Sequence, residues 1–531
     1  MTDAVVIGSG PNGLVAANLL VDAGWSVTVL EAQPTIGGAV RTDTELSPDW
    51  RLDTFSAFYP LAAASKTIAN LHLEEHGLVW VHAPAVLGNP LPDGNWALLQ
   101  RDRHDTAAGL DELCPGDGEA WLELCALWDG FGQDLIGTLL DPFPPLRHGV
   151  RFAVNLPRAG GLPALRLPLM SVRRLGQEYF KGEAPRLLLA GNALHADFSP
   201  EGAGSAIFGL LLSMLGQAVG FPVPQGGAGE LIAALARRFE SKGGEIHTGS
   251  EVTSVVIRDG RAVAVKLATG DEVQATRAVI ANVSAPALYG GLVSLDDLPD
   301  RTRRGMAGFE WDPSTVKVDW ALSGPVPWES APTVAPGTVH IAHSVDELST
   351  FSGQVSGNSI PSDPFLLIGQ MTTTDRTRSK PGTESLWAYA HVPQAPRGDA
   401  GDGGIRGVWD SSDLERFADR MQGRIERFAP DFSSRIVSRR VLGPHEFQAR
   451  DANLHRGAVN GGTAGLHQQL VFRPMPGMGR AETPIKGLFL GSASAHPGGG
   501  VHGAPGANAA KAALAHDRLR RLRPNLRKKS R

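Results

Sequence analysis

The sequence has few cysteines and little net charge. Cys114 and Cys125 are the only two in 531 residues, and ten residues separate them, so the chain has neither a CxxC redox pair nor a zinc-type cluster. We expect buried thiols without a redox function, and no metal site. The 50 basic and 55 acidic residues give a net charge of −5, which argues against a nucleic-acid partner.

The sequence also lacks a secretory signal and a convincing membrane span. Residues 4–7 already read as an apolar strand, with no charged segment or long apolar stretch before a cleavage site, so we expect a cytoplasmic protein. The most apolar stretch, residues 203–221, is interrupted by four glycines and is followed by Pro222. It therefore predicts a buried helix that lines an apolar cavity.

The amino-terminal residues 4–31 predict a strand, a glycine-rich turn, a helix and a second strand. The first strand covers residues 4–7, the helix residues 14–23 and the second strand residues 27–30, and Gly24 ends the helix. This is a βαβ unit of the size that binds dinucleotides.

The turn carries a GxGxxG motif in which each glycine has its own task. Gly8 permits the tight turn, Gly10 lets the backbone approach a pyrophosphate, and Gly13 allows close packing of helix on strand. Pro11 and Asn12 complete the turn, so the phosphates are expected at the helix amino terminus, where unpaired N–H groups favour an anion.

Glu31 ends the second strand, eighteen residues after Gly13. A carboxylate at this point can accept both hydroxyl hydrogens of an adenosine ribose and would repel a 2′-phosphate. Glu31 and the adjoining Ala32 are therefore predicted to lie at the adenosine end of a bound dinucleotide.

A second glycine pair decides which dinucleotide is expected. Gly37 and Gly38 are followed by Arg41, which can approach the same pyrophosphate or a flavin, although a solvated surface arginine is the plainer alternative. With the first motif and Glu31, this pattern resembles the GG-doublet flavoproteins, which include amine oxidases and phytoene desaturases. The resemblance implies that the cofactor is FAD.

Residues 222–283 predict a helix followed by a β-meander. Strands 252–257 and 262–267 flank Asp259 and Gly260, which form a strong hairpin signal, and a further strand at 278–281 returns to the main sheet. In the flavoproteins that the chain resembles, such a meander is inserted into the dinucleotide-binding domain. The resemblance implies that Val252 touches the adenine end of FAD and that Ala281 and Asn282 lie near its pyrophosphate.

Near the carboxyl terminus, a short strand at residues 487–491 leads into a glycine-rich passage and a helix from about residue 507. Such a passage can lay backbone against a flat ring, and the helix start directs partial positive charge towards it. The passage resembles the flavin-contacting motif of bacterial phytoene desaturases. Residues 473–474, 476–477, 483–488 and 495–501 resemble more closely the family of pyridine nucleotide-disulfide oxidoreductase domain-containing protein 2. The residues expected to contact the flavin are Gly491, Ser492, Gly499, Gly500 and Val501.

Three side chains are candidates for catalysis. His496 and His502 stand within the glycine-rich passage, where each can touch flavin or substrate or serve as a structural histidine. Lys317 lies in the alternating strand 315–320 and resembles the lysine that holds a water near the flavin in amine-oxidase-type proteins; an exposed strand lysine is the alternative.

These patterns predict an α/β fold, with a Rossmann-like FAD-binding domain that carries the inserted meander and a discontinuous α+β substrate domain. Residues 1–75, 222–299 and 451–531 are assigned to the FAD-binding domain, and residues 76–221 and 300–450 to the substrate domain. The GxGxxG spacing recurs at Gly498, but no strand runs directly into it and no second strand ending in an acid follows. We therefore expect a single dinucleotide site.

The predicted function is an FAD-dependent oxidoreductase acting on an apolar small molecule, such as a polyene or isoprenoid, by hydride transfer in desaturation, saturation or isomerisation. A flavin amine or amino-acid oxidase is the alternative among enzymes; the chain has only four tyrosines, none in the carboxyl-terminal motif. A binding protein for prenylated partners, like the GDP-dissociation inhibitors, is the alternative of another class. The intact glycine motifs and Glu31 argue against it.

The last fourteen residues, 518–531, carry eight basic and no acidic side chains. A solvated, disordered tail is the simplest expectation. Attraction to an anionic membrane surface, at about 1 kcal/mol for each basic residue held close to it, is the sharper alternative and would suit an enzyme that collects a lipophilic substrate.

Overall fold

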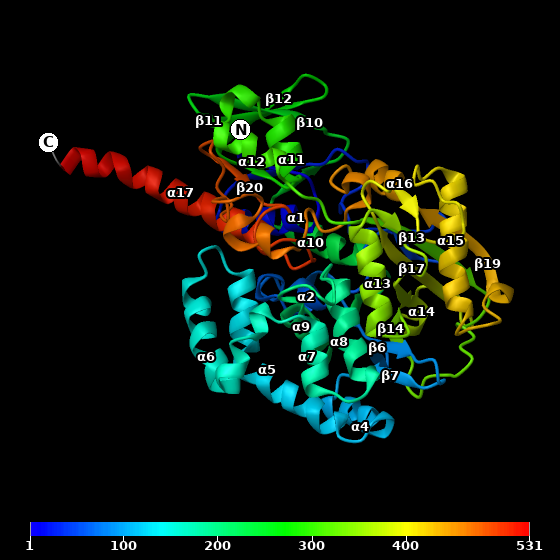
Figure 1. The fold of residues 1–531 in the computed structure, drawn as a ribbon. Helices are drawn as coiled ribbons and strands as arrows, with labels where there is room; N and C mark the ends of the chain where they lie inside the picture. Colours follow the sequence, from blue (N-terminus) through cyan, green and yellow to red (C-terminus); the bar gives the residue numbers. More distant parts are fainter. Residues whose placement is uncertain (1, 530–531) are drawn as a thin grey trace.

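The computed structural model describes residues 2–529. Two seven-stranded sheets with helices packed on them form an α/β protein (Figure 1), which confirms the predicted fold class. The strands of the first sheet come from the ranges assigned to FAD binding and those of the second from the ranges assigned to the substrate domain, and we keep that division as a proposal.

The first sheet contains the amino-terminal βαβ unit. β1 is parallel to β2 and β12, and β9 and β20 continue the sheet in parallel on either side. β10 and β11 join at Asp259 and Gly260, both with positive φ, and lead into β12, as predicted for the meander. In spatial order the strands are β10 (Val252–Arg258), β11 (Arg261–Leu267), β12 (Glu272–Ala281), β1 (Thr2–Ile7), β2 (Val27–Leu30) and β9 (Glu245–His247), and β20 (Leu488–Leu490) also pairs with β12.

Helices cover one face of this sheet. Alanines and leucines of α1 and α17 share an apolar cluster with Phe239 of α10 and with the inward side chains of β1 and β2. α1 begins at Pro11, three residues before the predicted start, because proline suits the first helical position, where its missing N–H would have no helical partner. The three helices are α1 (Pro11–Asp22), α10 (Gly229–Ser241) and α17 (Ala504–Lys529).

The second sheet is mixed and covered on both faces. One face packs against α15 (Ser411–Glu426) and the other against the helical layer described below. Its strands, in spatial order, are β19 (Ile436–Leu442), β13 (Ser314–Leu322), β17 (Glu384–Val392), β16 (Leu366–Gln370), β14 (Pro336–Ile341), β6 (Ala85–Pro90) and β7 (Trp96–Leu99). All nine residues of β13 are buried, so its alternating polarity does not mark a solvent-exposed face.

The helical layer contains the predicted buried helix. α9 is buried along most of its length, and no described helix is long and apolar enough to cross a membrane. The layer contains α4 (Arg103–Leu113), α5 (Asp117–Leu140), α6 (Leu146–Ala164), α7 (Val172–Tyr179), α8 (Glu183–His195), α9 (Ser205–Val219) and α13 (Val345–Ser356).

The carboxyl-terminal tail differs from the expectation of disorder. α17 continues through Lys529 and projects from the body of the molecule (Figure 1). Alanine, leucine, arginine and lysine, which have high helix propensity, predominate in it. Ser530 and Arg531, the end of the predicted tail, lie outside the described residues.

Candidate functional site

The glycine-rich turn lies at the carboxyl edge of parallel strands β2, β1, β12 and β20. The Gly8 N–H donates to Leu30 O at 2.8 Å, and the Asn282 N–H, just after β12, donates to Ile7 O at 2.9 Å. The Gly491 N–H, after β20, donates to Ala281 O at 2.9 Å. The predicted pyrophosphate residues and the start of the carboxyl-terminal passage therefore meet at one edge of the sheet.

The turn has no room for larger side chains. A Cβ added at Gly13 would lie 2.2 Å from Gly8 O and 2.9 Å from Asn282 Nδ2, and one added at Gly506 of α17 would lie 1.9 Å from Asn12 O. Gly8 also has a φ of +91°. Gly13 therefore lets α1 pack against Gly8 and Asn282, and Gly506 lets the start of α17 approach the start of α1.

The polar groups of this cradle suit a pyrophosphate. Within residues 2–529, the N–H groups of Asn12 and Gly13 in the first turn of α1 have no protein acceptor. Buried Nε of Arg41, after the second glycine pair, also has no hydrogen-bond partner. Unpaired donors at a helix amino terminus and an arginine are what a phosphate anion requires. The residues present therefore fit the phosphates of FAD.

Glu31 connects the turn to the end of β2. Its carboxylate accepts from the Ser9 N–H at 2.8 Å, from Ser9 Oγ at 2.7 Å and from the Gln33 N–H at 2.9 Å. Oε2 already accepts two of these bonds, whereas Oε1 accepts one and keeps a lone pair, so a bond to a ribose hydroxyl remains available there. Glu31 therefore also holds the glycine-rich turn in place through these hydrogen bonds.

The predicted adenosine end is assembled from neighbouring segments. The Ser250 N–H donates to Glu31 O at 2.7 Å, which sets the start of β10, with buried Val252, beside the end of β2. Ala32 is exposed at the same end. The contact of these residues with adenine stays a prediction.

The second glycine pair lies beside Asp451, an acidic residue that the sequence analysis did not identify. Gly37 and Gly38 have φ of +119° and +54°, and a Cβ at Gly38 would lie 3.4 Å from Asp451 Oδ2. Burial raises the pKa of Asp451, and the nearby Arg41 opposes that rise. Arg41 is half-buried and donates to Arg450 O at 2.7 Å, so it is not a free surface charge. Asp451 lies more than 400 residues from this turn in the sequence, and no local motif marks it.

The glycine passage at residues 498–500 rests on a loop held by Arg473. This arginine is 1% exposed and donates to the carbonyl oxygens of Asn460, Thr463 and Ala493 at 2.7–3.1 Å. A Cβ at Gly499 would lie 2.8 Å from Asn460 O. Arg473 is one of the residues that carry the family resemblance, but only the tertiary structure shows that it supports this loop.

Asp312 supports the same loop through the loop's backbone N–H groups. Its carboxylate accepts from the N–H groups of Val459, Asn460 and Gly462 at 2.6–3.0 Å. Burial, and next the negative charge of Asp197, raise the pKa of Asp312. A buried carboxylate thus fixes the backbone on which the passage rests.

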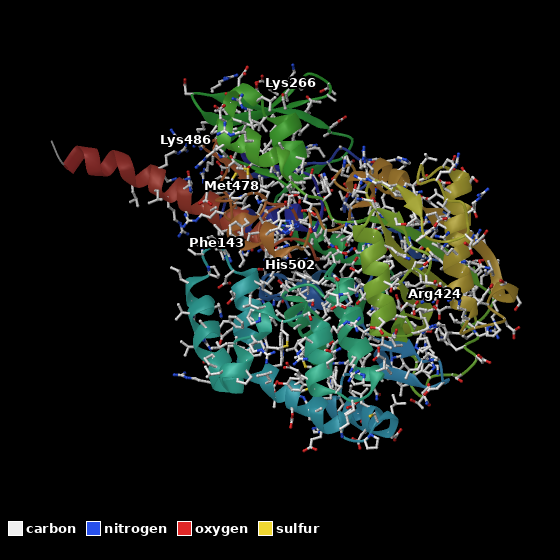
Figure 2. All side chains as sticks on the ribbon, viewed as in Figure 1. Phe143, Lys266, Arg424, Met478, Lys486 and His502 are labelled. Carbon is white, nitrogen blue, oxygen red and sulfur yellow. The ribbon has the colours of Figure 1, made fainter. Side chains whose placement is uncertain are left out.

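Both ring nitrogens of His502 have hydrogen-bond partners in the backbone of the glycine passage. Its Nδ1 accepts from the Ala504 N–H at 3.1 Å, its Nε2 lies 3.2 Å from Gly499 O, and burial lowers its pKa to about 4. Figure 2 places it near the middle of the molecule. A neutral ring with both nitrogens bound to backbone supports the glycine passage, and we propose a positioning role for it.

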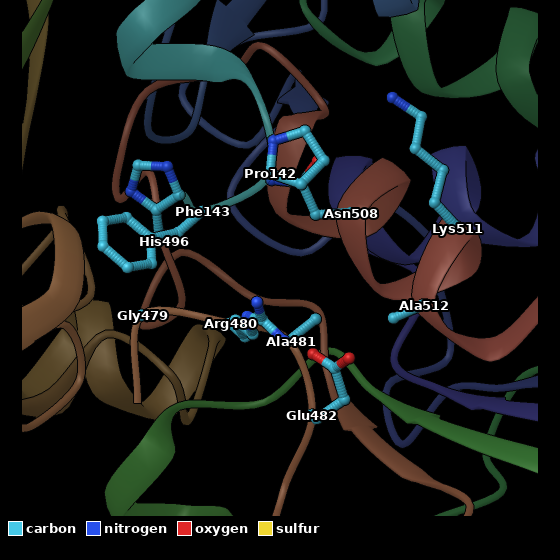
Figure 3. A pocket seen from close by; sticks show the side chains of 10 residues that line it. All are labelled: Pro142, Phe143, Gly479, Arg480, Ala481, Glu482, His496, Asn508, Lys511 and Ala512. Atoms are coloured by element: carbon cyan, nitrogen blue, oxygen red, sulfur yellow. The ribbon is translucent and has the colours of Figure 1, made fainter. Parts of the chain in front are cut away.

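His496 faces a pocket of about 230 Å³ (Figure 3). The pocket lies between α17, residues 479–482 and the segment that precedes α6. Nε2 of His496 lies 3.0 Å from Asp141 O, and its ring meets Phe143 edge to face, with centroids 6.2 Å apart. Buried Nδ1 has no hydrogen-bond partner. Its contacts anchor the loop before α6, and direct catalysis by His496 stays a prediction.

Lys317 is buried in β13 rather than exposed. Its ammonium pairs with Asp319, which also binds Arg440 at 2.8 Å, and it lies 5.9 Å from the centre of the Trp387 ring. Arg440 in turn binds Asp43 at 2.7 Å. The network ties the second sheet to the segment that follows Arg41.

Replacing Lys317 by methionine is expected to slow flavin reduction by substrate about tenfold or more while FAD stays bound, if this lysine acts beside the flavin. Asp319 keeps Arg440 as its partner, so the carboxylate is not left alone. Rapid-mixing absorbance of the flavin measures the rate. Lys266, an exposed strand lysine, supplies the control as Lys266→Met. Equal rates in both variants would remove Lys317 from the active site.

The two cysteines are not bonded to each other. Cys114 and Cys125 are both free; Cys125 is buried, and its thiol donates to Gln217 Oε1 at 3.3 Å. Burial raises the pKa of Cys125 to about 11, which disfavours the reactive thiolate. This agrees with the predicted absence of a thiol redox role.

Two family models match the chain. A model for NAD(P)-binding Rossmann-like domains matches residues 6–69, which contain both glycine motifs. A model for flavin containing amine oxidoreductases matches residues 166–377. The matches cover most of the amino-terminal βαβ unit, the meander and three strands of the second sheet, β13, β14 and β16.

Curated relatives align along nearly the whole chain. Pyridine nucleotide-disulfide oxidoreductase domain-containing protein 2 of Mus musculus is 28% identical, over 96% of this chain and 92% of its own. Hydroxyneurosporene desaturase of Rhodobacter capsulatus is 29% identical, over 98% of each chain. Among solved structures, wild-type putrescine oxidase bound to putrescine superposes with a TM-score of 0.60 at 17% identity, covering 97% of this chain and 98% of that one. That likeness shows the fold.

The cradle, its unpaired phosphate donors and the second glycine pair agree with what these matches indicate. The cofactor that the geometry and the flavin-containing family model both support is FAD. The chain is therefore an FAD-dependent oxidoreductase, and its residues 166–377 are similar to the flavin containing amine oxidoreductases.

Proposed function

We propose that the protein desaturates, saturates or isomerises an apolar polyene- or isoprenoid-like molecule. The observation that carries this proposal is the apolar lining beside the glycine passage. A Cβ at Gly500 would lie 2.7 Å from Leu61 Cδ1, and the rings of Phe198 and Phe208 stack with centroids 4.0 Å apart. Leu61, Phe58 and Phe208 remain only partly buried although they pack against the core.

Bound FAD would accept a hydride from the substrate or return one to it. The protein's own residues supply the rest: the cradle and Arg41 hold the phosphates, and the start of α17 directs its positive end at the passage. The apolar side chains orient the substrate and exclude water. The name of the Rhodobacter relative, a desaturase, supports this class of reaction.

An amine or amino-acid oxidase is the second candidate. The fold likeness to putrescine oxidase supports it, and Trp387 and Tyr389 stack with ring centroids 5.9 Å apart. Aromatic pairs of this kind can flank an amine. The two candidates differ in the charge that the substrate carries into the site.

An anaerobic screen of flavin bleaching tests the proposal. Carotenoid precursors, other isoprenoids and primary and secondary amines are mixed with the FAD-loaded enzyme, and the loss of the flavin absorbance band is followed. We expect bleaching by an apolar polyene or isoprenoid. Bleaching by amines alone would establish the second candidate. A protein that purifies without flavin would favour a binding role like that of the GDP-dissociation inhibitors.

NADH and NADPH are expected to reduce the flavin slowly or not at all. FAD occupies the one complete dinucleotide cradle found in residues 2–529, so no second Rossmann unit brings a nicotinamide to the flavin. Stopped-flow absorbance at saturating nucleotide, without oxygen, measures this rate. Rapid stoichiometric bleaching by either nucleotide would contradict the single-site interpretation.

We further propose that the enzyme is cytoplasmic and meets an anionic membrane through the basic part of α17. Leu519 and Leu522 on this helix are 60% and 57% exposed. α6 adds a second candidate surface, because Leu146, Val150 and Leu162 are 71%, 62% and 79% exposed on it. Arginines 147, 151 and 158 flank these apolar side chains. Exposed apolar residues beside arginines suit an anionic lipid interface.

Both surfaces lie on the left of Figure 1, and a pocket lies between the segment before α6 and the first turns of α17. Pro142 and Phe143, just before α6, line it together with Lys511 and Ala512 of α17. We propose that the two surfaces meet the same membrane.

Removal of residues 518–531 is expected to weaken binding to vesicles of phosphatidylcholine and phosphatidylglycerol at least tenfold, since several basic residues contribute about 1 kcal/mol each. Co-sedimentation at two salt concentrations measures binding. In the full chain, Leu146→Ser with Val150→Ser should also weaken it about tenfold, because two apolar side chains would no longer enter the interface.

Val437→Ser is the control for the α6 variant, since Val437 is 57% exposed on β19, on the other side of Figure 1. Unchanged binding by the shortened chain would refute the role of the tail. Equal losses in the α6 and Val437 variants would refute the role of α6.

A further inference from the structure

A polar cluster interrupts the apolar lining between β17 and the carboxyl end of α8. His391 of β17 pairs with Asp197 through its Nε2, 3.0 Å from the carboxylate. Asp197 follows α8 with a φ of +63°, a strained backbone for an aspartate. Tyr389 and His195 flank the pair, with ring centroids 6.4 Å apart, and His340 of β14 lies 5.8 Å from His195.

The cluster adjoins the glycine passage. Asn460 donates its side-chain N–H to Asp197, and Asn460 O lies 2.8 Å from the position a Cβ would take at Gly499. Gly499 is one of the residues predicted to contact the flavin. A substrate group held by the cluster would therefore lie beside the reacting part of the cofactor.

Two members of the cluster keep polar atoms without a partner. Tyr389 and His195 are half-buried between the second sheet and its helices, and Nδ1 of His195 is itself buried. Among the described residues, neither the Tyr389 hydroxyl nor the His195 ring has a hydrogen-bond partner. Fully buried His340 has none for either ring nitrogen. Buried polar groups of this kind cost free energy unless a ligand or water satisfies them.

The free groups are uncharged near neutral pH. Burial lowers the pKa of His195 to about 4 and lowers the pKa of His340 well below its ordinary value. Burial also raises the pKa of the Tyr389 hydroxyl. The cluster therefore offers neutral donors and acceptors.

The charged groups nearby are already paired. Asp197 accepts from His391 and Asn460, and Asp312 accepts from three backbone N–H groups. Lys317 is paired with Asp319. An ammonium group would find no free carboxylate among these residues, and a carboxylate would find no free cation.

We infer that Tyr389 and His195 form a binding site for a neutral hydroxyl or carbonyl group on an otherwise apolar substrate. The His391–Asp197 pair and Asn460 hold this site in place beside the flavin passage. The inference rests on the proposed function and narrows its substrate class to oxygenated isoprenoids.

Binding to the FAD-loaded protein tests the inference without turnover. Without oxygen, the shift of the flavin absorbance band is titrated with four probes of one C20 isoprenoid skeleton: alcohol, aldehyde, hydrocarbon and primary amine. In the wild type, the alcohol or aldehyde is expected to bind about tenfold more tightly than the hydrocarbon, as for one or two hydrogen bonds. Tyr389→Phe with His195→Leu should bring that ratio close to one while hydrocarbon affinity is kept. Tyr179→Phe, on α7, is the control.

The outcomes separate the binding site from the proposed reaction. An unchanged ratio in the double variant, no preference for oxygen in the wild type, or tightest binding of the amine would overturn the inference. A preference lost only in the double variant supports it, even if no probe bleaches the flavin. That last result would count against the proposed reaction alone.

Discussion

Replacing Gly13 by alanine is expected to abolish retention of FAD during purification. In an ordinary helix this exchange stabilises by up to about 1 kcal/mol. At position 13, however, the new methyl would lie 2.2 Å from Gly8 O and 2.9 Å from Asn282 Nδ2. The turn must open to relieve these contacts, at a cost of about 1–3 kcal/mol. The N–H groups that cradle the phosphates would move with it.

The predicted loss of FAD affinity is about fivefold to 150-fold, the factor that corresponds to about 1–3 kcal/mol. Flavin absorbance relative to protein after gel filtration measures retention. The matched control is Gly109→Ala on α4, where an added Cβ meets no atom within 4 Å. Full flavin content in the Gly13 variant would show that close packing at this turn is not needed for the cofactor.

Replacing Arg473 by methionine is expected to lower the temperature of flavin release by roughly 5 °C or more. The carbonyl oxygens of Asn460, Thr463 and Ala493 would lose their donor, and each unsatisfied buried group costs about 1–3 kcal/mol. The loop beneath Gly499 would then lose its support. Flavin fluorescence during heating measures the release.

Arg480→Met is the control for charge and length, because Arg480 is exposed in the same segment. Surface changes of this kind alter stability by about 0.5 kcal/mol or less. Arg473→Lys should fall between the two, since it keeps the charge but cannot reach all the carbonyls. Equal release temperatures for all three variants would contradict the role assigned to Arg473.

The first part of the cofactor site could be predicted because its residues are close in sequence. Gly8, Gly10, Gly13 and Glu31 belong to one βαβ unit, in which strand, turn and helix set their relative positions. The hairpin at Asp259 and Gly260 was predictable for the same reason, since two positive-φ residues suit a tight turn. Local geometry sufficed for these elements.

The catalytic candidates were harder to judge from sequence. His502 carries no local sign that both its nitrogens bind backbone. Lys317 stands in an alternating strand that is typical of one exposed face, but the helical layer and α15 bury both faces of that sheet. Burial by elements distant in the chain decides the state of such side chains.

The sequence by itself determined the dinucleotide cradle, the FAD preference of the second glycine pair and the meander, because these depend on spacing within a few turns of chain. Only the tertiary structure brought Asp451 to Gly38, Gly506 to Asn12, and Asp197 to His391. The members of these pairs lie 413, 494 and 194 positions apart in the sequence. Their contacts arise from the packing of whole sheets and helices, which no local pattern encodes.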